Sequence, residues 1–321
     1  MRVGLVGAGF MGGVHAKAWR QAGAELVAVV SARLEEAAAL AQAWGARPVA
    51  RYEELLELVD VVDLCVPTHL HAPMALEAIR AGRHVVCEKP IALRVEDGQA
   101  MIEAARRAGV RLFVAMVLRF FPQYRAAREI VKSGQIGSPG VIRLKRVSYC
   151  PQKAPDNWYL DEARSGGMMV DLMVHDFDYA RWLAGDVRRV YARAAGDRYA
   201  LVTLEFASGA MALVEGGWAY PPGIFRTALD VAGSEGLIEW SSDTSLTIHT
   251  YLASDGQGPA AVGLPLSPLA EDPFTAELKH VLQALRTGEP FDPAPEDALE
   301  ALRIALAARE SARTGRPVRL A

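Results

Sequence analysis

Hydrophobic and polar positions follow one rhythm over the first 118 residues. Short apolar runs typical of buried strands lie at residues 2–6, 25–30, 61–66, 84–87 and 111–116, and a further short strand is predicted near Pro48. Apolar residues at helical spacing lie between them, at residues 14–19, 34–44, 52–58, 72–81 and 95–108. Strands that alternate with helices in this way predict a parallel sheet covered on both faces. In such a sheet the ligand lies outside the carboxyl ends of the strands.

The pattern changes after residue 118. A helix is predicted at 124–132 and a strand at 141–149, and further strands follow at 187–194, 199–206, 210–218, 227–232, 237–240 and 246–251. Turn pairs such as Ser208-Gly209 separate them, as antiparallel hairpins require. Residues 255–268 predict a loop rich in glycine and proline, and residues 273–286 and 295–313 predict amphipathic helices that begin with proline.

Helices are expected on only one face of this second sheet, which leaves the other face to be covered. An uncovered sheet face is a natural subunit interface. We therefore expect a homodimer or homotetramer that associates through the second sheet.

The composition narrows the class of protein. The 321 residues are 51% hydrophobic, and 38 acidic residues nearly balance 35 basic ones, so nothing favours a nucleic acid or an anionic membrane as partner. No apolar run approaches the roughly 20 residues that cross a bilayer, and no signal peptide precedes the first strand. Cys65, Cys87 and Cys150 are few and far apart, which is typical of reduced cysteines in a cytoplasmic protein.

A glycine-rich turn joins the first strand to the first helix. Gly7 allows a tight turn, Gly9 lets the backbone approach a pyrophosphate, and Gly12 lets the helix and strand pack closely. The helix N-terminus that begins around Phe10 and Met11 offers N–H groups to phosphates. These five residues are predicted to bind a dinucleotide.

The end of the second strand bears on the type of nicotinamide cofactor. A free ribose 2′-hydroxyl usually meets an acidic residue about 20 residues after the glycines, but Ser31-Ala32-Arg33 stands there. A hydroxyl and a guanidinium suit a 2′-phosphate, so NADP is favoured over NAD. The alternative is that Ser31 caps the next helix and Arg33 is solvated.

The fourth strand ends in a polar turn that contains Pro67, Thr68, His69 and His71. Pro67, Thr68 and His71 are predicted to line the cofactor. Two histidines in such a turn are also potential metal ligands, but no nearby carboxylate or cysteine joins them, so a metal is not favoured.

The fifth strand ends in Glu88-Lys89-Pro90. Glu88 and Lys89 lie at the predicted ligand edge and are expected to contact the cofactor. Lys89 can also hydrogen-bond a substrate oxygen and stabilise negative charge that develops on it. A cis peptide bond before Pro90 is a testable expectation.

The stretch that begins with Gly166-Gly167 is the candidate for proton transfer. Asp171 and His175 are four residues apart, so on one continuous helix they lie on the same face. A carboxylate beside an imidazole fixes the proton on one ring nitrogen and raises its basicity, as a general acid or base requires. The alternative is a satisfied polar pair on a half-buried helix.

Other candidate substrate contacts lie outside these motifs. Arg119 follows the last strand of the first sheet, where it could meet the substrate or the nicotinamide, or form an interdomain ion pair. Asp156 and Trp158 lie in a polar, irregular segment. An indole face suits the C–H side of a sugar ring and a carboxylate suits its hydroxyls, although Trp158 could instead anchor the segment to the core.

The glycine turn, the 67–71 turn, Glu88-Lys89-Pro90 and the Gly166-Gly167…Asp171…His175 spacing together resemble the Gfo/Idh/MocA family of NAD(P)-dependent oxidoreductases. The likeness reaches the closing segment 311–319, and residues 175–185 look most like the inositol 2-dehydrogenase branch. Ser31-Ala32-Arg33 departs from the acidic residue of the NAD-preferring members.

The resemblance implies an α/β Rossmann domain at residues 1–118. An α+β domain with a large, mostly antiparallel open sheet follows at 119–321 and serves substrate binding and oligomerisation. It also implies that Lys89 and His175 are the catalytic pair, that Asp171 supports them, and that the substrates are sugars, polyols and related carbonyl compounds.

Three functions are then compared. The favoured one is an oxidoreductase in which His175 takes the hydroxyl proton as hydride moves between substrate and nicotinamide, Lys89 holds the substrate oxygen, and Asp171 orients His175. A non-catalytic sensor of the same fold would be expected to lack Lys89 and His175, and both are present. Metal-dependent hydrolysis would need His69 and His71 to converge with Asp171 and His175.

Overall fold

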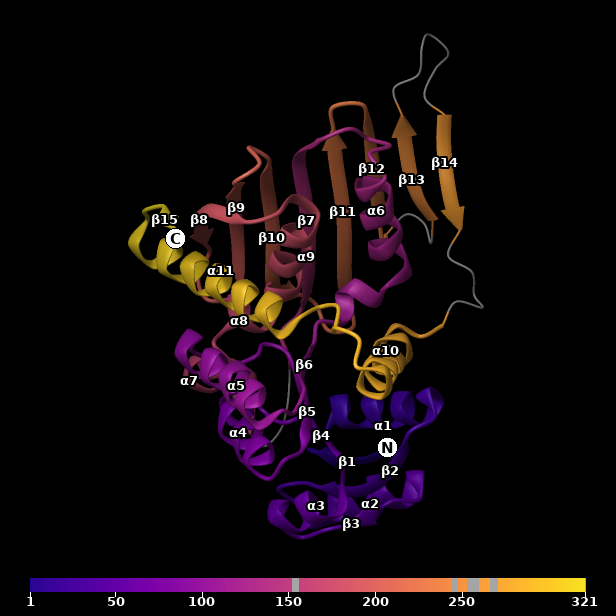
Figure 1. Cartoon of the computed structure of the whole chain (residues 1–321). Helices are drawn as coiled ribbons and strands as arrows, with labels where there is room; N and C mark the ends of the chain where they lie inside the picture. Colours follow the sequence, from indigo (N-terminus) through magenta and orange to yellow (C-terminus); the bar gives the residue numbers. More distant parts are fainter. Residues whose placement is uncertain (152–155, 244–246, 253–259, 266–270, 321) are drawn as a thin grey trace. The chain divides into compact units, whose positions relative to one another are not determined.

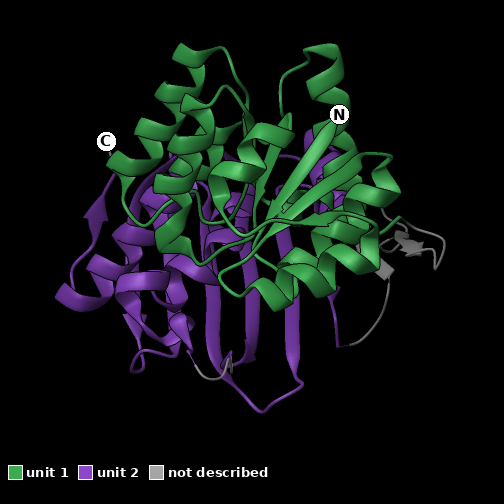
Figure 2. Ribbon diagram, turned by 90° about the horizontal axis from the view of Figure 1, so that it is seen from below, with its two compact units in different colours: residues 1–120, 271–299 green, residues 121–270, 300–321 purple. Residues whose placement is uncertain are grey.

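The computed structural model describes residues 1–151, 156–243, 247–252, 260–265 and 271–320, and the chain forms two compact units (Figure 2). Unit 1 comprises residues 1–120 and 271–299, and unit 2 comprises residues 121–270 and 300–321. The predicted division into 1–118 and 119–321 therefore misses the return of residues 271–299 to unit 1. The physical reason is helix α10, whose Leu278, Val281 and Leu282 share a core with Trp19.

Unit 1 contains a six-stranded sheet in the order β3-β2-β1-β4-β5-β6, and all of its strand pairs are parallel. Its strands are β1 (Arg2–Val6), β2 (Glu25–Val30), β3 (Arg47–Pro48), β4 (Val61–Leu64), β5 (His84–Glu88) and β6 (Leu112–Ala115) (Figure 1). This is the strand order of a dinucleotide-binding Rossmann sheet. The predicted parallel sheet is confirmed, and its strands are buried apolar runs because helices cover both faces.

The helices of unit 1 fall close to the predicted positions. They are α1 (Phe10–Ala22), α2 (Leu34–Trp44), α3 (Tyr52–Leu58), α4 (His71–Arg80), α5 (Val95–Ala108) and α10 (Pro273–Thr287), with short 3-10 helices at η1 (Thr68–Leu70) and η2 (Val117–Phe120). Helix α11 (Pro295–Thr314) begins in unit 1. Gly23, Gly45 and Gly109 end α1, α2 and α5 in the left-handed conformation that glycine adopts without a steric penalty.

Unit 2 contains a nine-stranded sheet in the order β14-β13-β12-β11-β7-β10-β9-β8-β15. Its strands are β7 (Pro139–Tyr149), β8 (Val187–Ala194), β9 (Tyr199–Phe206), β10 (Met211–Tyr220), β11 (Phe225–Gly233), β12 (Gly236–Ser241), β13 (Thr247–Leu252), β14 (Ala260–Pro265) and β15 (Val318–Arg319). Strands β7 and β10 pair in parallel and the other pairs are antiparallel, which confirms the mostly antiparallel sheet.

The prediction of a loop at 255–268 is wrong for its central residues, 260–265. Residues 260–265 form strand β14 at the edge of the sheet, where it pairs along its length with β13 and satisfies the backbone groups that face that strand. The remaining residues of that predicted loop, 255–259 and 266–268, lie outside the described residues.

The helices of unit 2 are α6 (Pro122–Lys132), α7 (Glu162–Ser165), α8 (Met168–Asp171), α9 (Val174–Ala184) and the continuation of α11, with a short 3-10 helix at η3 (Trp158–Leu160). Of these, α6, α8 and α9 contact the strands from one side of the sheet (Figure 1). On the other side, alternate residues of the strands expose large apolar side chains: Tyr191, Leu201, Met211, Leu213 and Phe225. One sheet face is thus packed and the other is open, as the alternation predicts.

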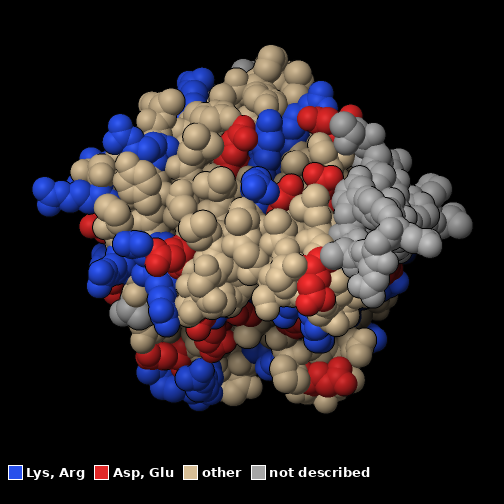
Figure 3. Space-filling view, turned by 90° about the horizontal axis from the view of Figure 1, so that it is seen from above, with Lys and Arg blue, Asp and Glu red and all other residues tan. Residues whose placement is uncertain are grey.

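Charged side chains are distributed without a dominant sign on the face that Figure 3 shows. Lys and Arg alternate there with Asp and Glu around a broad area of uncharged residues. This distribution agrees with the near balance of 35 basic and 38 acidic residues. Among the helices within the described ranges, none is long and apolar enough to cross a membrane.

Candidate active-site and cofactor residues

The glycine turn of unit 1 has the conformation that its spacing predicts. Gly7 has a φ of +100°, and a Cβ there would lie 2.4 Å from the carbonyl oxygen of Cys65. A Cβ on Gly12 would lie 2.0 Å from the carbonyl oxygen of Gly7. Both positions therefore require glycine, because the obstructing atoms are backbone.

The same turn exposes the N-terminus of α1. Gly9 occupies the N-cap position and makes no side-chain cap, and Phe10 is 84% exposed. The first-turn N–H groups, which include those of Met11 and Gly12, have no acceptor within the helix. An exposed helix N-terminus beside a tight glycine turn fits the diphosphate of a dinucleotide.

Glu36 contacts both residues that are predicted to select the cofactor, Ser31 and Arg33. Ser31 Oγ lies 3.3 Å from Glu36 Oε2, and the guanidinium of Arg33 forms an ion pair with the same carboxylate. Arg33, not Ser31, stands at the N-cap position of α2, and no side chain caps that helix. The predicted alternative in which Ser31 caps the helix is therefore wrong. Glu36 lies in the first turn of α2, three residues after Arg33, a spacing that indicates such an ion pair only once the start of the helix is known.

His71 ties two turns at the ligand edge together. Its ring is buried, with Nδ1 2.8 Å from the carbonyl oxygen of Pro90 and Nε2 3.0 Å from that of Val66. Burial lowers the pKa of this imidazole below its usual value. Thr68 is also buried and begins the 3-10 helix that follows Pro67. The ring thus lies between the 67–71 turn and the turn after β5, and in its neutral form it donates to one of the two carbonyl oxygens.

The Glu88-Lys89-Pro90 turn contains the expected cis peptide bond between Lys89 and Pro90, which confirms that prediction. Glu88 ends β5 and is 8% exposed, and its Oε2 accepts a hydrogen bond of 3.0 Å from the backbone N–H of Lys89. Lys89 itself is half-buried. The carboxylate of Glu88 therefore points back on its own turn.

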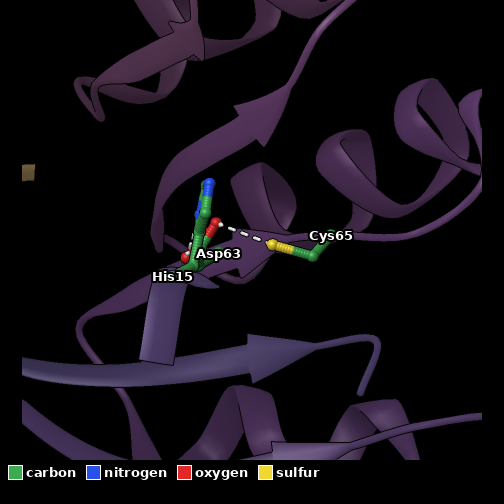
Figure 4. A group of neighbouring side chains, drawn as sticks. All are labelled: His15, Asp63 and Cys65. Atoms are coloured by element: carbon green, nitrogen blue, oxygen red, sulfur yellow. Dashed lines mark hydrogen bonds and ion pairs between the residues drawn. The ribbon is translucent and has the colours of Figure 1, made fainter. Parts of the chain in front are cut away.

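Glu88 belongs to a buried network that sequence reasoning missed. His15 Nε2 lies 3.1 Å from Glu88 Oε1, and His15 Nδ1 lies 2.9 Å from Asp63 Oδ2. Trp19 Nε1 donates a 2.7 Å hydrogen bond to the same Asp63 oxygen. Figure 4 shows His15, Asp63 and the thiol of Cys65 side by side. The available signals were an aspartate inside the apolar β4 run and a histidine on the buried face of α1.

The protonation of His15 and Glu88 is set by the charged groups that lie next to them. Burial by itself lowers the pKa of the His15 imidazole, but the Asp63 carboxylate outweighs it and the pKa lies well above its usual value. Burial likewise raises the pKa of Glu88, but the hydrogen bond and charge of His15 outweigh it and the pKa lies below its usual value. The network is therefore an imidazolium held between two carboxylates.

Donor atoms of His15, Asp63 and Cys65 lie within 4.8 Å of one another, a spacing that metal centres also show. The chemistry of the donors favours the hydrogen-bonded network instead. Desolvation raises the pKa of the Cys65 thiol to about 12, and a metal ligand must be a thiolate. The imidazole already faces a carboxylate with each nitrogen.

Glu277 of α10 is a further buried acid near this network. Among the residues that the structure describes, neither carboxyl oxygen has a hydrogen-bond partner, and the side chain is fully buried. Burial raises the pKa of Glu277 well above its usual value. The nearby charge of His15 lowers this pKa, and the charges of Glu88 and Asp63 raise it further. Glu277 is thus held as a neutral carboxylic acid.

In unit 2 the predicted single helix through Asp171 and His175 is interrupted. Asp171 ends α8 and His175 lies in the first turn of α9, with Leu172 and Met173 between the two helices. The regular helix is therefore broken between the two residues, although Leu172 and Met173 both keep right-handed helical dihedral angles, and the shared face stays a prediction. Asp171 is 6% exposed and His175 is half-buried.

An ion pair fastens the helix that holds His175 to the sheet. Arg146 of β7 binds Asp176 of α9, with 2.6 Å between Nε and Oδ2, and both side chains are buried. Tyr179 further along α9 donates a 2.9 Å hydrogen bond to the carbonyl oxygen of Tyr124. The position of His175 within unit 2 thus follows from contacts on both sides of its helix.

The remaining predicted substrate residues have partners of their own. Arg119 is 4% exposed and its guanidinium lies 3.1 Å from Asp292 and 3.3 Å from Asp297, all within unit 1. Asp156 forms an ion pair with Arg164. Trp158 is 8% exposed and stacks on the next residue at 3.9 Å between ring centroids.

Known proteins resemble this chain over its whole length. The family described as "Oxidoreductase family, NAD-binding Rossmann fold" matches residues 1–116, and the "GFO/IDH/MocA C-terminal domain" matches residues 124–239. The myo-inositol 2-dehydrogenase of Thermotoga maritima is 31% identical, with 100% of this chain and 98% of that protein covered. The D-apiose dehydrogenase of Paraburkholderia graminis is 32% identical, with 98% and 88% covered.

Solved structures agree with this relationship. An NAD-binding oxidoreductase from Klebsiella pneumoniae superposes with a TM-score of 0.91 at 27% identity, covering 100% of this chain and 99% of that one. The glycine turn that fits a diphosphate and the Glu88-Lys89-Pro90 turn lie in the part matched by the NAD-binding family. Asp171 and His175 lie in the part matched by the C-terminal family. The chain is therefore an NAD-binding oxidoreductase and belongs to the Gfo/Idh/MocA family.

Proposed function

We propose that this protein transfers a hydride between a nicotinamide nucleotide and a secondary alcohol or carbonyl group of a sugar, an inositol-like polyol or a related compound. The observation that carries the proposal is the full-length likeness to relatives named for inositol and apiose. The chain also keeps Lys89 at the end of β5 and His175 at the start of α9. A purely regulatory nucleotide-binding protein would have no need of either.

The residues divide the chemistry as follows. A bound nicotinamide ring supplies the acceptor or donor of hydride at its C4 carbon. His175 accepts the proton of the substrate hydroxyl in oxidation and returns it in reduction. Lys89 donates a hydrogen bond to the same oxygen and stabilises the negative charge that develops on it. Asp171 orients the imidazole of His175.

Turnover of substitution variants tests these roles. We expect Lys89→Ala and His175→Asn to lower kcat by about 10²- to 10⁴-fold, the range of a positioned acid or base, while the Kd for the cofactor changes little. The assay is nicotinamide absorbance with a panel of polyols and sugars. Lys132→Ala is the control, since Lys132 is exposed at the end of α6. Wild-type turnover in Lys89→Ala would remove Lys89 from the chemistry.

The preference for NADP is also a proposal. It is supported by the hydroxyl of Ser31 and the guanidinium of Arg33, which is about half-exposed at 54%. Glu36 competes with a 2′-phosphate for both groups. Exposed ion pairs of this kind are worth up to about 1 kcal/mol, or about fivefold in binding. We therefore expect Glu36→Gln to raise the ratio of kcat/KM for NADP to that for NAD several-fold, and Arg33→Ala to lower it.

Direct contacts of the substrate with Arg119, Asp156 and Trp158 are also proposed. The buried ion pairs of Arg119 favour a structural role, and the burial of Trp158 favours an anchor for its segment. Asp156 is exposed and keeps its carboxylate at the surface beside Arg164. An unchanged KM across the substrate panel in Asp156→Asn would exclude that carboxylate from binding.

We further propose a cytoplasmic homodimer or homotetramer. Association is supported by the open face of the unit 2 sheet, where Leu201, Met211 and Leu213 are each about half-exposed. Light scattering at micromolar concentration tests it, with Leu213→Glu expected to shift the mass towards the monomer. The three free cysteines support a reducing compartment.

A further inference from the structure

We propose that His15 is a positioning residue for the reaction, acting through Glu88 to fix the backbone on which Lys89 stands. This inference rests on the proposed role of Lys89. It adds a residue of the first helix that lies in the sequence far from either half of the proposed catalytic pair.

His15 is held by carboxylates at both of its ring nitrogens. Both ring nitrogens lie within hydrogen-bond distance of carboxylate oxygens, at 2.9 Å from Asp63 and 3.1 Å from Glu88. Ionised carboxylates only accept hydrogen bonds, so the ring must donate from both nitrogens as an imidazolium. Trp19 donates to Asp63 and fixes the far end of the network. His15 is fully buried, so water does not compete for these bonds.

The second step leads from Glu88 to Lys89. The Glu88 oxygen that does not face His15 accepts a 3.0 Å hydrogen bond from the backbone N–H of Lys89. One carboxylate therefore joins the imidazolium on one side and the Lys89 backbone on the other. Glu88 is only 8% exposed, so water cannot easily replace a hydrogen bond that its carboxylate loses when His15 is changed.

The third step concerns the other side of the turn. Nδ1 of His71 lies 2.8 Å from the carbonyl oxygen of Pro90. The backbone thus has contacts at the N–H of Lys89 and at the carbonyl group of Pro90, the next residue. A lysine has a long, flexible side chain, so fixing its Cα decides which positions its ammonium reaches. Displacement of a catalytic group by about 1 Å can cost about 10²-fold in rate.

A double-substitution cycle tests this chain of contacts. We expect His15→Gln and Glu88→Gln each to lower kcat at least about tenfold, with the cofactor Kd within about twofold of the wild type. If His15 acts through Glu88, the double variant loses no more than the worse single variant. His84→Gln is the matched control, since His84 is a half-buried histidine at the opposite end of β5. Additive losses, or an unchanged kcat in His15→Gln, would overturn the proposal.

A second readout does not depend on turnover. The chain has six lysines, so selective ¹⁵N-lysine labelling gives few backbone amide signals and the exchange of the Lys89 amide can be followed by NMR. We expect its exchange to quicken at least about tenfold in His15→Gln and in Glu88→Gln, and to stay unchanged in His84→Gln. Unchanged protection in both variants would refute the link, and Glu88→Gln carries this measurement if His15→Gln does not fold.

The two readouts separate this inference from the proposed function. If Lys89→Ala keeps wild-type turnover, the proposed chemistry fails, whatever the amide exchange shows. If Lys89→Ala is inactive while His15→Gln turns over normally, the chemistry stands and the role of His15 fails.

Discussion

Replacing Glu277 by glutamine is expected to change how the stability of unit 1 depends on pH. The carboxyl group of Glu277 in α10 is fully buried, and neither oxygen has a hydrogen-bond partner within the described part of the chain. Burial raises its pKa well above the usual value, so the folded protein holds a proton there that the unfolded chain releases. Glutamine has nearly the same shape but cannot titrate.

The magnitude follows from proton linkage. A carboxyl group with a higher pKa in the folded state binds more protons when folded, so the free energy of unfolding falls as pH rises between the two pKa values. The window opens at the unfolded value of about 4.3 and closes at the raised folded value. Within it the wild type loses about 1.4 kcal/mol per pH unit relative to Glu277→Gln. The variant is therefore the more stable protein at neutral pH, and its advantage shrinks as pH approaches about 5.

Urea unfolding at several pH values between about 5 and 8 measures this difference, with peptide-resolved hydrogen exchange reporting on the strands of unit 1. Glu57→Gln is the control, since Glu57 is exposed on α3 of the same unit. We expect the pH profile of Glu57→Gln to follow the wild type. Parallel profiles for the wild type and Glu277→Gln would refute the reasoning, because they would mean that the folded state holds no extra proton at this position.

Substitutions at two further places, the glycine turn and the Arg146–Asp176 ion pair, test the packing that positions the site. A Cβ at Gly12 would lie 2.0 Å from the backbone oxygen of Gly7, whereas a Cβ at Gly13 meets nothing within 4 Å. We expect Gly12→Ala to cost about 1–3 kcal/mol of stability and to weaken cofactor binding, and Gly13→Ala to stabilise by about 0.5–1 kcal/mol, measured by thermal unfolding and cofactor titration. Arg146→Met leaves the buried carboxylate of Asp176 without its cation and is expected to cost about 3–5 kcal/mol in urea unfolding. Arg146→Met combined with Asp176→Leu should recover most of that loss, and failure to recover would contradict an origin in the unpaired charge.

Local sequence determined most of the fold and the cofactor turn. The parallel sheet of unit 1 follows from apolar runs between amphipathic helices, because burial on both faces demands that pattern. Gly12 follows from a local steric requirement, since its Cβ would meet the backbone oxygen of Gly7, whereas the obstruction at Gly7 comes from Cys65 at the end of a neighbouring strand. The cis peptide bond before Pro90 is permitted by the local sequence, because the imide weakens the trans preference.

Only the tertiary structure decided features that join distant residues or depend on a backbone turn. His15 meets Asp63 and Glu88 from 48 and 73 residues away, and no periodicity reports such a contact. Residues 271–299 return to unit 1 because α10 finds an apolar face on α1, which the order of the chain does not reveal. The four-residue spacing of Asp171 and His175 did not predict the break between α8 and α9, because the spacing argument assumes a continuous helix. Sequence periodicity records local geometry, whereas charge pairing and helix docking depend on which surfaces meet after the chain has folded.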